Sequence, residues 1–262
     1  MLHDKSVKLS PKPFSVGFRI EHPQELIDKN QYGKYAGHPQ LGAAEYQLAF
    51  RTSSGRSVYS FCMCPGGTVI GSSSEENSIV TNGMSQYARS GANANSAIVA
   101  EVFPEDYGQH PMDGFLFQRK WEKNAFMMGG GNYDAPVQLV GDFLHGITRS
   151  GIGDVIPSYL PGYKLCDLRQ ALPSQVVKSI QEALPVFNRK IQGFTMPVAI
   201  LTGVETRTSS PLRILRGGDF QSVSCKGLYP VGEGSGYSGG IMSSAIDGIK
   251  AAEMIIEKKN RG

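Results

Sequence analysis

Near its carboxyl end the chain contains the run Gly232-Glu233-Gly234-Ser235-Gly236-Tyr237-Ser238-Gly239-Gly240-Ile241. It follows an apolar run at 227–231, which predicts a strand, and it precedes a helix-like run from 241 to about 258. The free N–H groups and the positive dipole end at such a helix start favour a phosphate or a flavin. The order of strand, glycine turn and helix predicts α/β architecture.

Three of these glycines, Gly234, Gly236 and Gly239, match the dinucleotide fingerprint G-x-G-x-x-G. That fingerprint opens a β-α-β unit, with an acidic residue on a second strand roughly 20 residues later. Here only about 20 residues follow, and Glu253 and Glu257 lie in helical sequence. We therefore expect this stretch to be the closing wall of a cofactor site and not its opening fingerprint.

The composition is that of a globular protein. Of 262 residues, 40% are hydrophobic and 19% are charged, and the formal net charge is +3. The small charge and the lack of a basic run argue against a nucleic-acid or membrane-surface partner. No apolar run approaches the ~20 residues of a membrane span, and the first residues lack a signal-peptide core. We expect a cytoplasmic protein with reduced thiols and no metal site, since the cysteines have no zinc-ligand spacing: Cys62, Cys64, Cys166 and Cys225.

Hydrophobic periodicity predicts the remaining elements. Strands are expected at 14–20, 46–50, 58–63, 68–70, 97–103, 198–203 and 213–215, with a hairpin turn at 52–56 and 68–70 continuing the same sheet. Helices are expected at 23–29, 115–126 and 174–191, the last kinked or split at Pro185. On the final helix one face is shared by Ile241, Ala245, Ile249, Ala252 and Ile256. The β-rich middle indicates an insertion between two pieces of an α/β domain, α+β overall.

Five segments together resemble one family: 62–67, 81–84, 93–97, 205–211 and 232–241. It is the family of poorly characterised FAD-dependent dehydrogenases, or NAD(P)/FAD-dependent oxidoreductases, within the glutathione-reductase-like two-dinucleotide-binding flavoproteins. The resemblance runs over nearly the whole chain. It implies a partial FAD-binding, Rossmann-like domain at 1–20 and 198–262. A β-rich substrate or cap domain would be inserted at 21–197.

The chain departs from this family at its start, where members carry a Rossmann unit with G-x-G-x-x-G. The resemblance therefore implies the C-terminal portion of a larger flavoprotein, as a truncation, an internal start or a split gene. We expect the missing N-terminal FAD-binding half to be its partner. The chain alone is expected to bind FAD weakly or not at all and to be inactive.

The resemblance assigns FAD, with NAD(P) as a second candidate cofactor, to the glycine-rich stretch. It implies that Glu233 faces the ribityl or pyrophosphate region and that the helix start lies against the flavin ring. The alternative is a plain helix N-terminus after a long turn. The predicted cofactor-binding residues are Gly232, Glu233, Gly234, Gly236, Tyr237, Gly239, Gly240 and Ile241.

Three residues are candidates for chemistry. Arg207 follows a buried strand and is expected to contact an anionic substrate or the flavin, unless it forms a surface pair. Cys62 and Cys64 would share one face of an extended strand as a redox or nucleophilic group, or be core residues. His22, at a strand end, is a weaker acid–base candidate. Side chains predicted to bind a polar substrate, or else to stabilise turns, are Asn82, Asn95, Asn132 and Glu205.

The function expected from these features is the C-terminal part of an FAD-dependent oxidoreductase, a dehydrogenase acting on an unidentified small molecule. The chemistry would reside on the cofactor. One alternative is a non-catalytic binding or assembly module that retains the fold. Another is an RNA-modifying flavoprotein, which the weak net charge argues against.

Overall fold

The structure is a computed structural model that describes residues 5–261. It mixes helices with strands, which confirms the expected α+β class. The chain forms two compact units. The first combines the chain up to Ser15 with Val102–Gln118 and Arg207–Gly262; the second combines Val16–Glu101 with Arg119–Thr206. The predicted domain boundaries at residues 20 and 198 stay a prediction.

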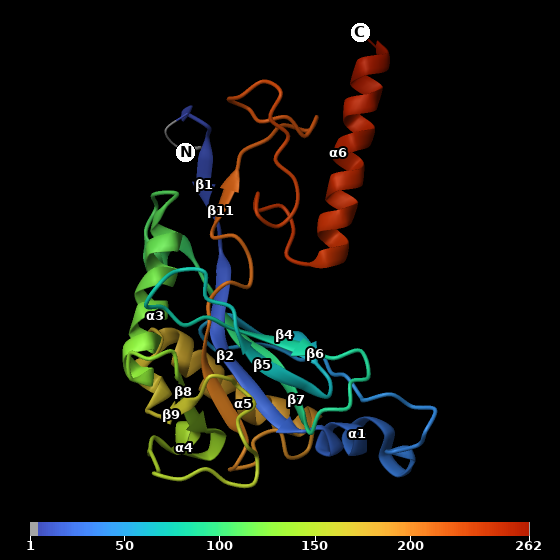
Figure 1. Cartoon of the computed structure of the whole chain (residues 1–262). Helices are drawn as coiled ribbons and strands as arrows, with labels where there is room; N and C mark the ends of the chain where they lie inside the picture. Colours follow the sequence, from blue (N-terminus) through green and yellow to red (C-terminus); the bar gives the residue numbers. More distant parts are fainter. Residues whose placement is uncertain (1–4, 262) are drawn as a thin grey trace. The chain divides into compact units, whose positions relative to one another are not determined.

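The second unit is built around a seven-stranded sheet in the order β3-β4-β7-β2-β10-β8-β9 (Figure 1). The β3–β4, β4–β7, β2–β10 and β8–β10 pairs are antiparallel, and β8–β9 is parallel. The predicted hairpin is confirmed as β3–β4. The strand bounds are β2 Phe14–Pro23, β3 Ala49–Arg51, β4 Ser57–Cys64, β7 Asn93–Val102, β8 Ala135–Leu139, β9 Tyr163–Leu165 and β10 Ile200–Glu205.

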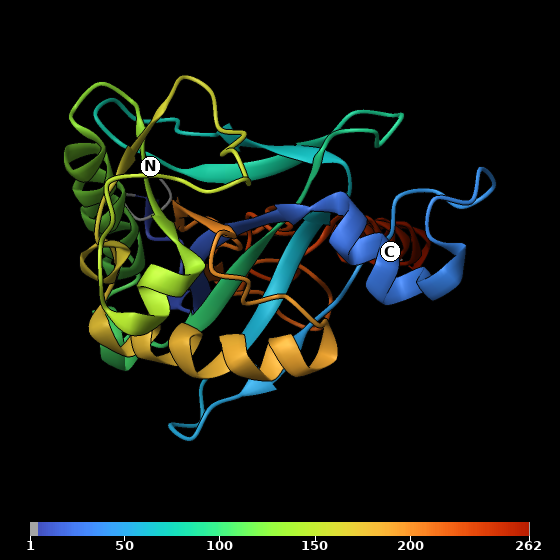
Figure 2. The ribbon, with the colours of Figure 1, turned by 90° about the horizontal axis from the view of Figure 1, so that it is seen from below.

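One face of this sheet is covered by α5 (Ser174–Lys190), which contacts β3 and β4 (Figure 2). Its apolar stripe is buried, including Ile180, Leu184 and Phe187. The helix continues through Pro185, so the predicted split does not occur. The other helical segments are α1 Gln24–Tyr32, η2 Gly33–Tyr35, α3 Asp113–Gly129, α4 Val140–His145 and η3 Leu168–Gln170.

Strands β5 (Gly67–Gly71) and β6 (Thr81–Ser85) form a separate antiparallel sheet of two strands. The prediction that 68–70 continues the large sheet is therefore wrong. The physical reason is the tight turn before β5, where Gly66 has a φ of +50° and lets the chain leave the path of β4. Strand β6 contacts β4 and β10.

The first unit contains a short antiparallel pair, β1 (Leu9–Pro11) with β11 (Leu212–Ile214), together with α2 (Pro104–Tyr107) and α6 (Ile241–Arg261). Helix α6 and β11 were expected from the sequence. The strand predicted at 227–231 is wrong, because this segment is an irregular loop. Pro230 cannot donate to a ladder, and its carbonyl instead accepts a hydrogen bond from Arg216 Nη1.

Candidate functional site

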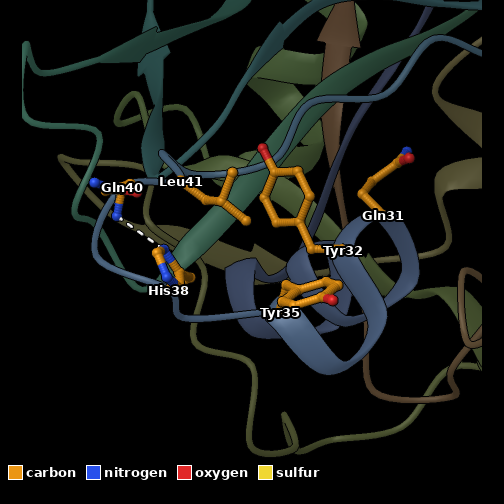
Figure 3. Close-up of a pocket in the computed structure, with 6 residues that line it drawn as sticks. All are labelled: Gln31, Tyr32, Tyr35, His38, Gln40 and Leu41. Atoms are coloured by element: carbon orange, nitrogen blue, oxygen red, sulfur yellow. Dashed lines mark hydrogen bonds between the residues drawn. The ribbon is translucent and has the colours of Figure 1, made fainter.

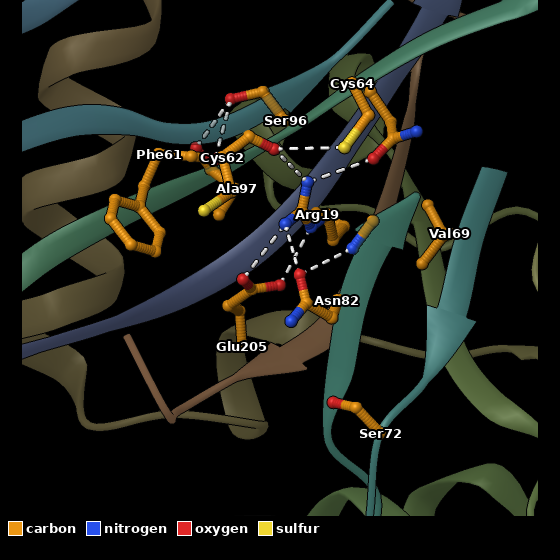
Figure 4. A network of polar contacts seen from close by, with 12 residues as sticks. Arg19, Phe61, Cys62, Cys64, Val69, Ser72, Asn82, Ser96, Ala97 and Glu205 are labelled. Atoms are coloured by element: carbon orange, nitrogen blue, oxygen red, sulfur yellow. Dashed lines mark hydrogen bonds and ion pairs between the residues drawn. The ribbon is translucent and has the colours of Figure 1, made fainter. Parts of the chain in front are cut away.

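A buried arginine on β2 brings together four of the residues predicted to carry function. Arg19 has no exposed surface. Its Nε and Nη2 donate to the two Glu205 oxygens at 2.8 and 3.1 Å. The remaining donors reach the Cys62 carbonyl (2.8 Å), Asn95 Oδ1 (3.0 Å) and Asn82 Oδ1 (3.0 Å). Figure 4 shows Arg19 with Glu205, Cys62 and Asn82 around it. A guanidinium has five N–H groups, so each has an acceptor here.

Strand alternation places Arg19 on the same side of β2 as Glu21. Charged residues at alternate positions of a strand ordinarily indicate a side that faces solvent. In the structure β6 covers it. A Cβ at Gly83 would approach Arg19 Nη1 to 2.5 Å and overlap Asn95 Oδ1, so glycine permits this close contact. The covering strand removes Arg19 from water and makes its acceptors necessary.

The Arg19–Glu205 pair is an internal ion pair. Burial opposes the charge on Arg19, but the facing Glu205 carboxylate raises the pKa of the guanidinium, which stays protonated. Glu205 is 3% exposed and uses both oxygens for Arg19. The cluster therefore holds β2 and four other strands together, and in this structure Glu205 faces Arg19 and not an open pocket.

A β-bulge separates the two predicted cysteines. The register of β4 against β7 shifts between Phe61 and Cys64, and Cys62 has a φ of +44°. The expectation of two thiols on one face of an extended strand is therefore wrong. Cys62 is exposed, whereas Cys64 is partly buried and its Sγ donates to the Cys62 carbonyl at 3.4 Å.

The two thiols also differ in their electrostatics. Burial raises the pKa of Cys64, and the neighbouring Arg19 charge offsets this only in part. Cys64 is therefore a protonated thiol at neutral pH. Cys62 lines an open pocket of about 440 Å³, together with Glu45, Tyr46, Gln47, Ser60, Phe61 and Met63. Of the two candidates, Cys62 is the more exposed and is the one that lines this pocket.

A second hollow of about 440 Å³ lies beside α1 and η2 (Figure 3). None of the predicted site residues lines it. Its walls carry exposed side chains, and one internal bond joins the Gln40 N–H to His38 Nδ1 at 3.3 Å. It is lined by Gln31, Tyr32, Tyr35, His38, Gln40 and Leu41.

Other predicted residues lie outside the Arg19 cluster. Asn132 stabilises its own turn, because its side chain donates to Asp134 Oδ2 at 2.9 Å. Arg207 is exposed and belongs to the first unit. His22 is buried within β2, where Nε2 lies 2.7 Å from the Phe194 carbonyl oxygen, so it faces the core and not a site. Burial lowers the pKa of His22 to about 4.

The glycine-rich turn is attached to α6 by an arginine. Arg216 forms a fork-like ion pair with Asp247 at 2.6 and 2.9 Å, and its guanidinium stacks 3.7 Å from the centroid of the Tyr237 ring. The Gly232 N–H donates to the same carboxylate at 2.8 Å. Gly232 and Gly236 adopt positive φ, of +76° and +85°. These contacts set the path of the turn before the helix.

The start of α6 is accessible. Ile241 is 90% exposed, and apart from chain neighbours no residue that the structure describes lies within 4 Å of the positions that a Cβ would take on Gly234 or Gly239. By helix geometry, the first N–H groups of α6 have no partner within the helix. With the positive dipole end, such a surface fits one wall of a site for an anionic cofactor. The predicted cofactor residues Gly239 and Ile241 are thus exposed at the helix start. Gly232, Ser235 and Gly236 of the same turn are buried.

Sequence reasoning missed Arg19 and Glu21. Glu21 is fully buried and accepts hydrogen bonds from Asn93 Nδ2 and from the Ser158 backbone and hydroxyl. The available signal was a pair of charges at alternate positions inside an otherwise apolar strand. Such a pair indicates either a solvated face or a covered polar cluster. The two are distinguished by the position of β6 over Arg19 and of Ser158 beside Glu21.

Among the described residues 5–261, no group of three or more histidine, cysteine, aspartate or glutamate side chains has a metal-binding arrangement. No helix there has the length and apolar character needed to cross a membrane.

The sequence profile of a family described as "FAD-dependent protein, C-terminal domain-like" matches residues 13–208. The chain belongs to this family of FAD-dependent proteins. An uncharacterised protein of Clostridium beijerinckii is 52% identical over 260 residues, covering 98% of this chain and 49% of that protein. The chain thus spans about half the length of the curated relative it matches. Neither comparison names a nicotinamide cofactor.

The matched range contains the whole Arg19 cluster but ends before the glycine-rich turn. The family therefore associates the domain of β2, β4, β7 and β10 with FAD-dependent proteins. The match to the 52% identical relative covers 98% of this chain, so it reaches into the turn and α6.

Proposed function

We propose that this chain is the C-terminal part of an FAD-dependent oxidoreductase, in which it closes the flavin site and supplies the substrate domain. The observation that carries this proposal is the match of residues 13–208 to the C-terminal domain of FAD-dependent proteins. The accessible start of α6 supports it, because an exposed helix N-terminus favours the anionic parts of a flavin cofactor.

In this proposal Gly239, Gly240 and Ile241 contact the cofactor, and Arg216 with Asp247 holds them in place. When bound, FAD supplies the capacity to accept a hydride or an electron pair. The chain's own residues orient the cofactor and stabilise negative charge on it through the helix dipole. The pocket beside Cys62 is the proposed location of the small-molecule substrate, because it is open and bordered by the ordered bulge of β4.

The experiment is a chimera in which this chain replaces the matching half of the Clostridium beijerinckii relative. The purified chimera should show a flavin absorbance spectrum that bleaches on reduction and returns in air. A colourless chimera with a native circular-dichroism spectrum would refute the proposal and support the binding or assembly module instead.

A substitution in the chimera tests the contact itself. Apart from its two chain neighbours, no residue of the described range 5–261 lies within 4 Å of a Cβ on Gly239, so Gly239→Val places its added side chain at an open position. We expect it to lower the flavin content at least fivefold, because the new side chain occupies space that the cofactor needs. Gly42→Val is the control, since Gly42 is equally open, and it should leave the flavin content unchanged. Equal flavin content in both variants would remove Gly239 from the site.

A further inference from the structure

Helix α6 carries an apolar face that the chain leaves in solvent. Five large side chains on it are between 47% and 90% exposed: Ile241, Met242, Ile246, Ile249 and Ile256. At about 100° per residue, these positions and the exposed Ala245 and Ala252 fall within roughly 140° of the helix circumference. The face contains the same residues whose periodicity identifies the helix in the sequence. Apolar groups gathered in this way mark an interaction surface.

The orientation of this face is fixed by contacts on another side of the helix. Ala251 is 4% exposed, Asp247 pairs with Arg216, and the Ser244 hydroxyl lies 2.7 Å from that of Ser238. Figure 1 shows the segment between β11 and α6 running beside one flank of the helix. These contacts fix the rotation of α6 about its own axis within its unit, and they leave the apolar face on the exposed side.

A third sector of α6 is polar. Lys250 and Glu257 are exposed there, one helical position away from Ile249 and Ile256. A surface helix of a globular protein needs one apolar stripe. This helix has a packed side, an apolar side and a polar side, which is the pattern of a helix lying between two protein layers with only its polar edge in water.

We propose that the apolar face of α6 docks onto the half of the FAD-dependent protein that this chain does not span. This inference rests on the proposed function for the nature of that half. The family domain is a C-terminal one, and the Clostridium beijerinckii relative is about twice as long as the segment matched here. The relative therefore carries a second half of comparable size that a helix of this kind can pack against.

The chemistry of the face favours a protein layer over other occupants. Its centre is isoleucine, methionine and alanine, and the charged residues inside the roughly 140° sector are Glu253 and, at its edge near the end of the helix, Lys259. A membrane-surface helix or a nucleic-acid contact would require a row of lysine or arginine beside it. The occupant is thus an apolar surface of the other half, next to the cofactor wall at the start of the same helix.

The test co-expresses this chain with the tagged, unmatched half of the Clostridium beijerinckii protein and measures how much chain is captured on the tag. Ile249→Gln with Ile256→Gln removes the centre of the face. Lys250→Gln with Glu257→Gln is the matched control, with the same spacing and the same introduced side chain on the polar sector. All four positions are exposed, so the helicity of the isolated chain should not change.

We expect the unmodified chain and the control to be captured equally and the isoleucine variant at least tenfold less. The proposal is overturned if the unmodified chain is not captured, or if the isoleucine variant is captured as well as the control. If light scattering shows that the unmodified chain is a dimer and that the isoleucine variant is a monomer, the proposal is also overturned, in favour of a second copy as the occupant.

Capture without flavin would leave the docking intact and refute the proposed cofactor role. If the isoleucine variant still forms the complex and that complex contains flavin, the docking proposal is refuted and the proposed cofactor role stands.

Discussion

Arg19 shows how a single buried charge organises a region of this protein. Its five donors meet acceptors from β10, β4, β6 and β7, so four strands depend on one side chain. A buried ion pair contributes little net stability against an apolar replacement, but the loss of one partner leaves the other uncompensated. The cluster therefore acts as a constraint on which strands come together.

Replacing Arg19 by methionine should lower the free energy of unfolding by about 3–5 kcal/mol, because Glu205 is left buried without its partner. Urea denaturation measures this. Arg19→Met with Glu205→Leu should recover most of the loss, since no charge then remains. Arg89→Met, which removes the exposed pair with Glu45, should cost at most about 1 kcal/mol. Equal losses in Arg19→Met and Arg89→Met would contradict the interpretation.

His22 makes stability depend on pH. Burial lowers its pKa to about 4, against 6.5 for a solvated histidine. As the pH falls below 6.5 the unfolded chain takes up a proton that the folded chain excludes, so the free energy of unfolding decreases down to about pH 4. At about 1.4 kcal/mol per pKa unit, the loss approaches about 3 kcal/mol.

The measurement compares unfolding of the natural chain and of His22→Gln at pH 7 and near pH 4. Because glutamine does not titrate, the variant should lose about 3 kcal/mol less over this interval than the natural chain. His145→Gln, at an exposed position, should lose as much free energy of unfolding between pH 7 and about pH 4 as the natural chain does. Parallel pH profiles for His22→Gln and the natural chain would show that His22 is not the group responsible.

At the scale of elements, β2 determines how closely the central strands approach. It neighbours β7 in the sheet, and a Cβ at Gly17 would overlap the Ile98 carbonyl of β7 and lie 2.8 Å from Val99 Cα. Backbone atoms cannot move aside as a flexible side chain can. Glycine at this position is therefore a requirement of strand packing.

Gly17→Ala should reduce the free energy of unfolding by at least about 1–3 kcal/mol, the range for overpacking a closed interior. Gly42→Ala introduces the same methyl group into open space and should change stability by no more than about 0.5 kcal/mol. Urea midpoints of the two variants provide the comparison. A Gly17→Ala protein as stable as Gly42→Ala would mean that β2 and β7 can separate without cost.

At the scale of the whole molecule, the relative is about twice as long as the segment matched here, and in the proposed function this chain supplies only one wall of the flavin site. We expect titration of FAD with the chain alone to leave the flavin fluorescence nearly unchanged at micromolar concentrations. The chimera with the other half of the relative provides the positive control. A dissociation constant below about 1 μM for the chain alone would contradict this expectation.

Local patterns were sufficient for most elements. Alternation identified β2, β4 and β7, and a 3.6-residue period identified α3, α5 and α6, because these periods depend on neighbouring residues alone. The failures have local causes as well. A proline in 227–231 left no strand, and a bulge at Cys62 separated two thiols that an extended chain would have aligned.

The sequence by itself determined the α+β class, the positions of the main helices and strands, and the family to which the chain belongs. The tertiary structure alone decided that Asn82, Asn95 and Glu205 surround a buried Arg19, and that the apolar face of α6 is left in solvent. Periodicity in the sequence predicts that a strand or a helix has a polar face and an apolar face. Which layer covers that side depends on chain segments far apart in sequence, and here β6 covers one polar face while no described segment covers an apolar one.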